Sequence, residues 1–505
     1  MKKKIFLLML FTMMVFVGCG EKKENENEKN NTLVFSQISE GKTLDPQDTT
    51  EQYSQRLITV LYDRLVEIDE MTGKIVPGLA KSWEYEDPNT LIMHLNDNVY
   101  FHNGDKFSAE DVKYTLERAK TLPKVAHLYA LIDKVEVIDP VTVKIHTSEP
   151  FAPLLAHLSH KTASIIDKKY FEEKGIDGFQ NPVGTGPYKF KDWKVGDRIT
   201  IEANDEYFKG APAIKYVVVR AIPEENSSVI GLETGEINMT ADLNAESRRL
   251  VMNDKNLIYK EMPGISVSYI GFNTSKGIFK DKDVRRAVAM GIDRDAIIQS
   301  IFLGSVKKAN SFIAPGTFGY NPDSRVVDYN PEEAKRIIKE KGLEGTTIVM
   351  GTSNSPVRMQ MSEVIQAQLK DIGLDVKIQG LEWGAFLAAT GRGDLDMFSL
   401  GWGPSTYDGD YGYFPNFHSS QLGSAGNRAQ YVNPKMDKLL DAAKREIDPE
   451  KRKELYKEVS DIIYEDVPVI PVYYTNNTVA ATNDVEGVEP TSYILFQNLK
   501  FKGTK

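Results

Sequence analysis

The stretch VRMQMSEVIQAQLKDIGLDVKI, residues 357–378, indicates the fold class of this chain. Its first part places apolar side chains three and four residues apart: Val357, Met361, Val364, Ile365, Leu369 and Ile372. This spacing predicts an amphipathic helix, which we expect to end at Gly373. Leu374, Val376 and Ile378 then alternate with polar residues, as in a half-buried strand. A helix followed at once by a strand indicates an α/β fold, in which helices cover a sheet.

Elements on either side of this stretch fit the same class. Residues 134–146 alternate apolar and polar side chains around Asp139-Pro140, which predicts a β-hairpin, and residues 198–203 predict another strand. Apolar residues at helical spacing predict a helix over 283–302. Three further helices are expected to begin with a capping residue followed by proline, at Asn330-Pro331, Asn433-Pro434 and Asp448-Pro449. We expect the first of them to end at Gly342. Because no linker separates these segments, we expect domains built from interleaved parts of the chain.

The first residues have the composition of an export signal. Three lysines precede an apolar run at 5–17, which is shorter than the roughly 20 residues that span a bilayer. Cys19, the only cysteine in 505 residues, ends this region in a setting that resembles a lipoprotein box. We therefore expect a signal peptide at 1–18 and a lipidated Cys19. Residues 21–31 carry no apolar side chain, so we expect a disordered tether within 19–32.

Charge and hydropathy argue against other classes of protein. Removal of residues 1–18 changes the formal net charge from −10 to −13, because that segment contains three lysines and no acid. Proteins that bind nucleic acids usually carry a basic surface instead. No other stretch of the sequence is long and apolar enough for a transmembrane helix. With one cysteine the fold has no internal disulfide, and a chain of this length can be held by its core.

The sequence lacks the motifs of common catalytic and metal sites. It contains neither His-Glu-x-x-His nor Gly-x-Ser-x-Gly. Gly41-Lys42-Thr43 resembles the end of a phosphate-binding loop, but Ser36 stands where the first glycine must be. His157 and His160 are the only close histidine pair and have no third ligand nearby, so we interpret them as structural. We expect no enzymatic activity, no metal site and no cofactor.

Six ordered motifs, spread over more than 400 residues, resemble one family of proteins. The most specific is VYFHNGDKFSAEDV at 99–112, which follows PGLAKSWE at 77–84. The others are LDP at 44–46 with LYDRLV at 61–66, VGTGPY at 183–188, FNT at 272–274, VRRA at 284–287 with IDR at 292–294, and PVIPVYY at 468–474. With these segments the chain resembles the peptide- and nickel-binding family of ABC-importer substrate-binding proteins, extracellular solute-binding protein family 5.

The resemblance implies a periplasmic-binding-protein-like fold of two lobes that close on a ligand like a hinged trap. The first lobe would contain an inserted subdomain at 78–185. The remaining boundaries would be 33–77, 186–272 and 478–505 for lobe one, and 273–477 for lobe two. The chain would cross between the lobes near Phe272 and near Thr478, so we expect the hinge at these two positions.

By the same resemblance, the glycine-rich loop that follows Trp402 would line the ligand pocket, with Tyr407 as part of its wall. Dipeptide-binding members place an aspartate three residues beyond this tryptophan, where the present chain has Ser405. The loop looks more like that of members that bind glutathione or longer peptides. Asp408 or Asp410 would then provide the negative charge for the ligand's ammonium group. The alternative is that these two acids only shape the loop through turns.

For a ligand carboxylate, arginine is the suitable partner, because its guanidinium can bind both oxygens. Arg358 lies at the start of the 357–372 helix, in a region where family members carry an arginine. A solvated surface position is the alternative for this residue. Arg428 is a second candidate. Trp383 matches a family tryptophan near the pocket, with core packing as the alternative.

The function implied is that of a monomeric lipoprotein, anchored to the cell membrane and facing the periplasm or the cell exterior. It would capture oligopeptides, dipeptides or glutathione-like peptides and deliver them to the membrane and ATP-binding subunits of an ABC importer. Because close relatives bind nickel complexes, a carrier of nickel or of another small solute is an alternative, although only His418 lies near the pocket loop. Binding of haem or sugars stays open. A surface enzyme or adhesin is a more distant alternative.

Overall fold

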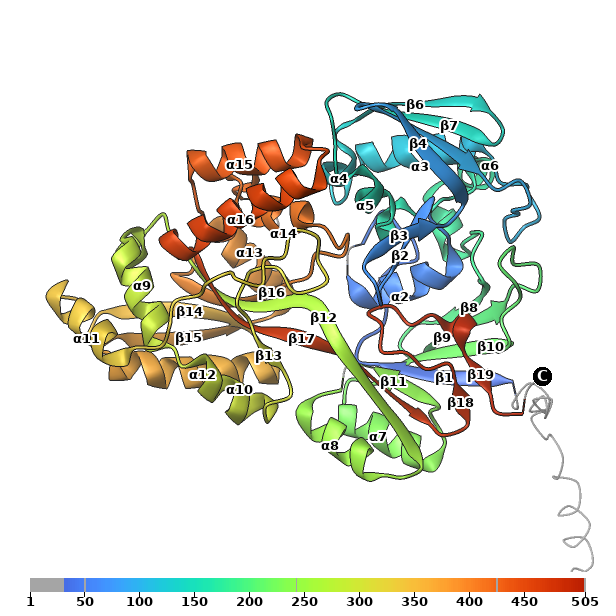
Figure 1. Cartoon of the computed structure of the whole chain (residues 1–505). Coiled ribbons are helices and arrows are strands. Elements are labelled where there is room, and N and C mark those ends of the chain that lie inside the picture. The colour runs from blue at the N-terminus through green and yellow to red at the C-terminus, as the bar shows by residue number, and fades with distance from the viewer. Residues whose placement is uncertain (1–30, 50, 242, 424–425, 504–505) are drawn as a thin grey trace, which may run out of the picture.

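The computed structural model describes residues 31–49, 51–241, 243–423 and 426–503. The predicted signal peptide, Cys19 and nearly all of the predicted tether lie outside the described residues. Helices and strands alternate along the chain and form the predicted α/β fold (Figure 1). In the described part of the chain, no helix combines the length and apolar character needed to span a membrane.

Within the residues that the structure describes, one sheet of 11 strands runs through the molecule (Figure 1). Its strands are β1 (Thr32–Gln37), β8 (Tyr188–Lys194), β9 (Arg198–Ala203), β10 (Tyr216–Ala221), β11 (Met239–Ala241), β12 (Leu257–Phe272), β13 (Lys307–Lys308), β14 (Thr347–Ser353), β15 (Asp375–Leu381), β16 (Met397–Trp402) and β17 (Val469–Thr482). The order is β15-β14-β16-β12-β17-β11-β1-β10-β9-β8, and β13 pairs with β17. Strands from distant parts of the sequence are thus neighbours, which confirms the predicted interleaving.

The long strands β12 and β17 join the two halves of this sheet. They contain 16 and 14 residues and pair antiparallel from Leu257 to Gly271, with a shift of register between Pro263 and Val267. We call the half with β1 and β8–β11 lobe one, and the half with β14–β16 lobe two. Among the strands of the described residues, only β12 and β17 are long enough to belong to both halves, so a change in the angle between the lobes must bend these two strands.

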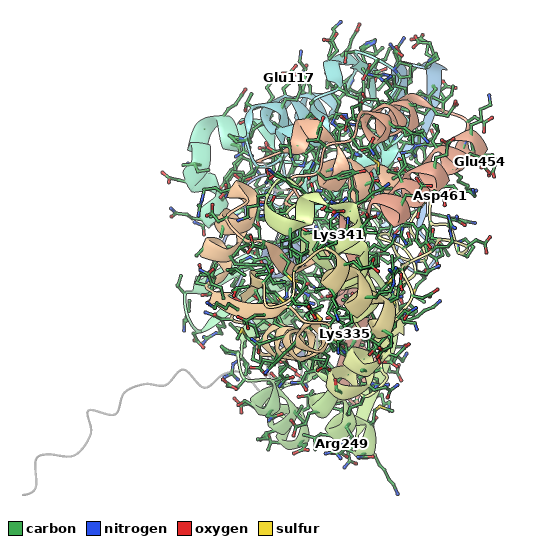
Figure 2. All side chains as sticks on the ribbon, turned by 90° about the vertical axis from the view of Figure 1, so that its left-hand side faces the viewer. Glu117, Arg249, Lys335, Lys341, Glu454 and Asp461 are labelled. Atoms are coloured by element: carbon green, nitrogen blue, oxygen red, sulfur yellow. The ribbon has the colours of Figure 1, made fainter. Side chains whose placement is uncertain are left out.

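Helices cover both lobes. In lobe one they are α2 (Gln52–Leu61), α7 (Glu225–Thr234), α8 (Ala245–Asn253) and the 3-10 helix η5 (Phe496–Asn498). In lobe two they are η3 (Gly277–Lys280), α9 (Lys282–Gly291), α10 (Arg294–Phe302), α11 (Pro331–Glu340), α12 (Pro356–Asp371), α13 (Trp383–Arg392), α14 (Gly409–Phe417), η4 (Ser419–Gln421), α15 (Pro434–Arg445) and α16 (Pro449–Asp466). The helices α2 and α14 are buried along most of their length, whereas others leave one face in solvent. In α11, for example, Ala334 and Ile338 are buried while Lys335 projects into solvent (Figure 2).

A separate antiparallel sheet, with the order β4-β5-β7-β6, stands beside lobe one (Figure 1). Its strands are β4 (Ala80–Asp87), β5 (Thr90–Leu95), β6 (Ile132–Asp139) and β7 (Thr142–Thr147), and its helices are α3 (Ala109–Thr121), α4 (Ala126–Tyr129), α5 (Leu154–Leu158), η1 (Lys161–Ala163), α6 (Lys168–Lys174) and η2 (Gly175–Gln180). Two small sheets pair β2 (Val66–Asp69) with β3 (Lys74–Pro77) and β18 (Val485–Glu486) with β19 (Lys500–Phe501). The β6–β7 hairpin confirms the prediction for 134–146.

The buried apolar side chains form several clusters rather than one. One cluster is made almost entirely by residues between Leu65 and Val183. A second joins β1 and α2 with the C-terminal segment of the chain, and two more lie between Val267 and Tyr474. The buried side chains thus fall into separate groups along the chain, and Val267 to Phe272 pack with the groups of lobe two. The residue boundaries of the two lobes and of the inserted subdomain stay a prediction.

Local capping explains where most helices begin. Asn330, Asn433 and Asp448 accept hydrogen bonds from backbone N–H groups in the first turns of α11, α15 and α16, as predicted. The single helix predicted over 283–302 is wrong, because α9 ends at Gly291 and α10 begins at Arg294. The side chain of Asp293 accepts from the N–H of Ala296 and caps a second helix within the same apolar pattern.

The VGTGPY motif packs against the C-terminal end of α2. Only glycine fits at positions 184 and 186. A Cβ on Gly184 would lie 2.1 Å from the carbonyl oxygen of Leu61, and a Cβ on Gly186 would lie 2.4 Å from the carbonyl oxygen of Val60. Between them, the Thr185 hydroxyl donates to Asp63 at 2.9 Å. The two glycines therefore fix how closely this segment approaches the helix.

Replacement of Gly184 with alanine is expected to lower the free energy of unfolding by about 1–3 kcal/mol, because the new methyl group overpacks a backbone contact. Urea denaturation checks this. Gly384, in the first turn of α13, is the matched control, since the atom nearest to an added Cβ is a side-chain oxygen of Glu382, 3.1 Å away, rather than backbone. We expect Gly384→Ala to retain the stability of the wild type. Equal stability of Gly184→Ala and wild type would contradict the packing argument.

Candidate functional site

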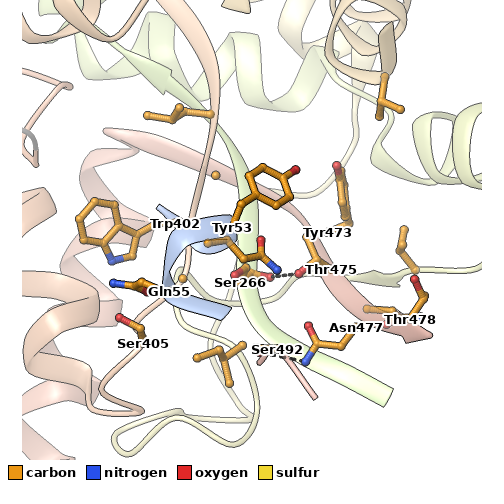
Figure 3. A pocket seen from close by; sticks show the side chains of 18 of the residues that line it. Tyr53, Gln55, Ser266, Trp402, Ser405, Tyr473, Thr475, Asn477, Thr478 and Ser492 are labelled. Carbon is orange, nitrogen blue, oxygen red and sulfur yellow. Dashed lines mark hydrogen bonds between the residues drawn. The ribbon is translucent and has the colours of Figure 1, made fainter. Parts of the chain in front are cut away.

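A pocket of about 1230 Å³ lies between the two lobes. Lobe one contributes Tyr53 and Gln55 from α2, and lobe two contributes Trp402 and Ser405 from β16 and the loop that follows. Figure 3 shows these side chains with Tyr473, Thr475, Asn477 and Thr478 of β17, which forms another part of the wall. The pocket thus lies beside the two strands that join the lobes, where a change in lobe angle would open or close it.

Aromatic rings make up much of the pocket wall. They come from both lobes: Tyr53, Trp383, Trp402, Tyr407, Tyr411, Tyr473 and Tyr493. The Trp402 indole is held in place by a hydrogen bond from Nε1 to the carbonyl oxygen of Tyr411 at 2.9 Å. Trp383 is 44% exposed, so the alternative of core packing does not describe its position. Such a wall can contact ligands of varied shape through area and ring stacking.

Five of the residues predicted from the sequence line the pocket. They are Trp383, Trp402, Ser405, Tyr407 and Arg428. Tyr407 has a left-handed backbone conformation, with φ of +57°, which is uncommon for a residue with a side chain. Arg358, Asp408 and Asp410 were also predicted, but they do not line the pocket, because each is surrounded by other parts of the chain.

Arg358 lies directly behind the wall. Its guanidinium carbon is 5.2 Å from the centre of the Trp383 ring, and Nη2 would be 3.8 Å from a Cβ placed on Gly401, another lining residue. Nη1 is buried and has no hydrogen-bond partner among the described residues. Burial lowers the pKa of Arg358, an effect that the hydroxyls of Tyr473 and Tyr269 oppose. A buried cation without an acid partner is costly unless a ligand supplies the negative charge.

Arg428 is a second cation at the same wall. Its Nη1 donates to the carbonyl oxygen of Leu387 and to Oγ1 of Thr390, both at 2.6 Å, which fixes the guanidinium against α13. Burial also lowers the pKa of Arg428, and Tyr269 is the group that opposes this. Tyr269 therefore lies near both guanidiniums. In the described part of the chain neither arginine forms an ion pair with a carboxylate.

Asp408 is enclosed in the core of lobe two rather than in the pocket. Both of its oxygens accept from Arg452, at 2.7 and 2.6 Å, and both side chains are more than nine-tenths buried. The same carboxylate accepts from the N–H of Asp410 and so caps α14. Asp408 thus fixes the end of the pocket loop, which agrees with the alternative role that we gave to the loop acids.

Asp410 is also buried outside the pocket. Its Oδ2 lies 3.2 Å from Nε2 of His157, and its Oδ1 lies 3.9 Å from Nζ of Lys444. Burial alone would raise the pKa of this carboxyl, but Lys444 and His157 outweigh burial and lower the pKa to about 2. Asp408 and Asp410 thus already have cationic partners in the chain, so we do not propose either of them as a ligand-binding residue.

Sequence reasoning missed most of the polar wall. Thr475, Asn476, Asn477 and Thr478 line the pocket from β17, together with Ser492. The Asn477 amide donates to the Ser492 hydroxyl at 3.0 Å (Figure 3). The run Thr-Asn-Asn-Thr is a signal that could have found them, since four consecutive polar residues are unusual in the middle of a buried strand. Among the described residues no group of three or more metal-binding side chains is arranged to hold a metal ion.

Comparison with known proteins places this geometry in one family. Residues 74–424 match the family described as "Bacterial extracellular solute-binding proteins, family 5 Middle". The dipeptide-binding protein of Escherichia coli (strain K12) is 29% identical over 93% of this chain and 95% of its own length. The glutathione-binding protein GsiB of Salmonella paratyphi A (strain ATCC 9150 / SARB42) is 30% identical over 88% of this chain and 89% of its own length.

A solved structure agrees with these relatives. The periplasmic binding protein DppA from Helicobacter pylori, in complex with the peptide STSA, superposes with a TM-score of 0.84 at 29% identity and covers 94% of this chain and 100% of that chain. The resemblance noted in the motifs and the two-lobe fold are both confirmed. The chain therefore belongs to the bacterial extracellular solute-binding proteins of family 5.

Proposed function

We propose that this protein is the substrate-binding lipoprotein of an ABC importer and captures peptides in the pocket between its lobes. It would be exported through the signal at 1–18, held at the membrane by a lipid on Cys19, and deliver its ligand to the permease. The relatives that bind dipeptides, glutathione and the peptide STSA support a peptide ligand. Hydrolysis of ATP would belong to other subunits.

The observation that carries the proposal is the pair of guanidiniums at the lobe-two wall, neither of which forms an ion pair among the described residues. Arg358 and Arg428 lie beside the pocket, and the neighbours that shift the pKa of each are tyrosines rather than carboxylates. A peptide's terminal carboxylate would provide the missing negative charge, and a guanidinium can bind both of its oxygens. We therefore place the carboxyl end of the ligand at these two arginines.

The size of the pocket is sufficient for a peptide. Its volume of about 1230 Å³ exceeds the roughly 300–1,000 Å³ that usually enclose a drug-sized ligand. The polar groups of 475–478 could bind the amides of an extended ligand, and the aromatic rings could contact varied side chains. Closure of the lobes about β12 and β17 would then exclude water from the bound peptide.

Thermal unfolding of the mature chain, with Cys19 replaced by alanine, tests the ligand class. Peptide libraries of increasing length, both forms of glutathione, and nickel salts should be compared. A ligand present at 100 times its Kd adds about 2.7 kcal/mol of stability, which raises the melting temperature measurably. Stabilisation by peptides or glutathione would support the proposal. Stabilisation by nickel or another solute, with none by any peptide, would support solute binding but contradict the proposal of a peptide ligand.

A further inference from the structure

The inserted subdomain contacts lobe two at a surface beside the pocket. At its centre Asp410 of α14 pairs with His157 of α5, which is 253 residues away in sequence. At its edge Arg445 of α15 donates to both oxygens of Glu149, at 2.7 and 3.1 Å. The backbone N–H of Ala152 donates to the carbonyl oxygen of Lys444 at 2.9 Å. We call this set of contacts, made by Glu149, Ala152, His157, Asp410, Lys444 and Arg445, the latch.

The central pair of the latch is buried on both sides. The side chains of His157 and Asp410 are 5% and 6% exposed. Nδ1 of His157 lies 2.9 Å from the carbonyl oxygen of Leu128, so both ring nitrogens face oxygen atoms. The doubly protonated ring can donate to both at once, which would make the bond to Asp410 charge-assisted. Lys444 adds a second cation near the same carboxylate.

Tyr411, the residue after Asp410, extends this contact into the other lobe. It belongs to the apolar cluster of the inserted subdomain although it lies on α14 of lobe two. The rings of His127, His157 and His160 surround it, with centroid distances of 6.4, 6.5 and 5.7 Å. Separation of the lobes would expose this side chain and leave the Asp410 carboxylate without His157.

The central pair and the edge pair of the latch contribute no side chain to the pocket wall, since His157, Asp410, Glu149 and Arg445 are all absent from its lining. We propose that the latch stabilises the closed arrangement of the lobes independently of the ligand and so sets the affinity for every ligand by a common factor. The apparent Kd of a closing protein equals the intrinsic Kd divided by the fraction of molecules that are closed. The inference rests on capture of a solute between the lobes, but not on the solute being a peptide.

A direct test measures the distance between the lobes without any ligand. After Cys19 is replaced by alanine, spin labels on cysteines introduced at Glu117 and Glu454 report this distance. Both positions are exposed (Figure 2), and they lie in the two parts that the latch joins, Glu117 on α3 of the inserted subdomain and Glu454 on α16 of lobe two. We expect Asp410→Asn and His157→Gln to shift the distribution toward longer distances. Asp295→Asn, which alters an exposed ion pair with Lys308 elsewhere in lobe two, should leave it unchanged.

Binding provides the second readout. For two peptides of different sequence that bind the wild type, Asp410→Asn should weaken both by the same factor, in the range of about 5- to 150-fold typical of coupled equilibria. Glu149→Gln, at the more exposed edge, should act in the same direction with a smaller effect and little risk to folding. Unchanged distances in the ligand-free variants, or loss of affinity for one peptide only, would contradict the proposed role of the latch. Because the distance measurement needs no ligand, it remains valid if no peptide binds.

Discussion

Replacement of Arg358 with methionine is expected to weaken the binding of carboxylate-bearing peptides by about 10- to 150-fold without destabilising the ligand-free protein. The loss of affinity corresponds to the roughly 1.5–3 kcal/mol of a hydrogen bond to a charged group. Stability should be retained or increased, because Nη1 of Arg358 is buried with no partner in the described part of the chain. An apolar side chain of similar length removes that desolvated charge and fills the same space. Calorimetric titration and urea denaturation measure the two effects separately.

The control for this experiment is an arginine that is exposed and already paired. Arg336 on α11 donates to Glu333 at 2.7 Å, far from the pocket wall, and its replacement by methionine should leave affinity unchanged. Arg358→Lys keeps the charge but not the two-pronged geometry, so we expect an intermediate affinity. If Arg358→Met bound the same peptides as tightly as the wild type, the carboxylate site at this residue would be wrong.

Replacement of Asp408 with alanine should have the opposite signature, a large loss of stability. Its bidentate pair with Arg452 is buried, and removal of one partner leaves the other charge without compensation, at a cost of about 3–5 kcal/mol. The Tyr456 hydroxyl, which accepts from Arg452 at 2.8 Å, cannot replace the carboxylate. Urea denaturation of the whole protein, followed by tryptophan fluorescence, should show the effect without any ligand.

A double variant separates the two roles that Asp408 could have. If the carboxylate serves only to neutralise Arg452, then Asp408→Leu combined with Arg452→Met should recover most of the lost stability, because no buried charge remains. The recovered protein should bind peptides. A stable Asp408→Ala variant that no longer bound any peptide would instead indicate that Asp408 binds the ligand.

The parts of the fold that depend on neighbours in sequence could be predicted. Capping by Asn330, Asn433 and Asp448 acts within one helical turn, so the sequence alone reveals it. The strand that follows Gly373 is likewise set by local alternation of side chains. The break between α9 and α10 was missed because the apolar pattern continues across it, and Asp293 was not recognised as a second cap.

The candidate site was predictable only in part, because its electrostatics depend on distant residues. Trp402 and Tyr407 were expected at the pocket from the family resemblance of their loop, and they do line the pocket. The two acids of the same loop could not be interpreted correctly, since their partners Arg452 and His157 are 44 and 253 residues away. Whether an acid faces a ligand or a cation of its own chain is decided by the tertiary fold, which local sequence does not show.

In the proposed orientation of the ligand, the cations of the wall would matter more for binding than the acids of the loop. Two guanidiniums held near Tyr269 provide a positive region on lobe two, and the polar run of β17 lies along the pocket. A peptide whose carboxyl end meets the arginines could then extend past β17. The latch would act on the same closing motion from outside the pocket, so contacts with the ligand and contacts between lobes would contribute separately to affinity.

The most direct test of this account is calorimetric titration with one peptide that binds the wild type, prepared with a free C-terminal carboxylate and as the C-terminal amide. If the carboxylate binds at Arg358 and Arg428, the amide should bind at least about tenfold more weakly to the wild type, in line with the loss of a charged hydrogen bond. Arg358→Met should bind the two forms with similar, reduced affinity. Equal affinity of the wild type for both forms would contradict a carboxylate site at Arg358 and Arg428.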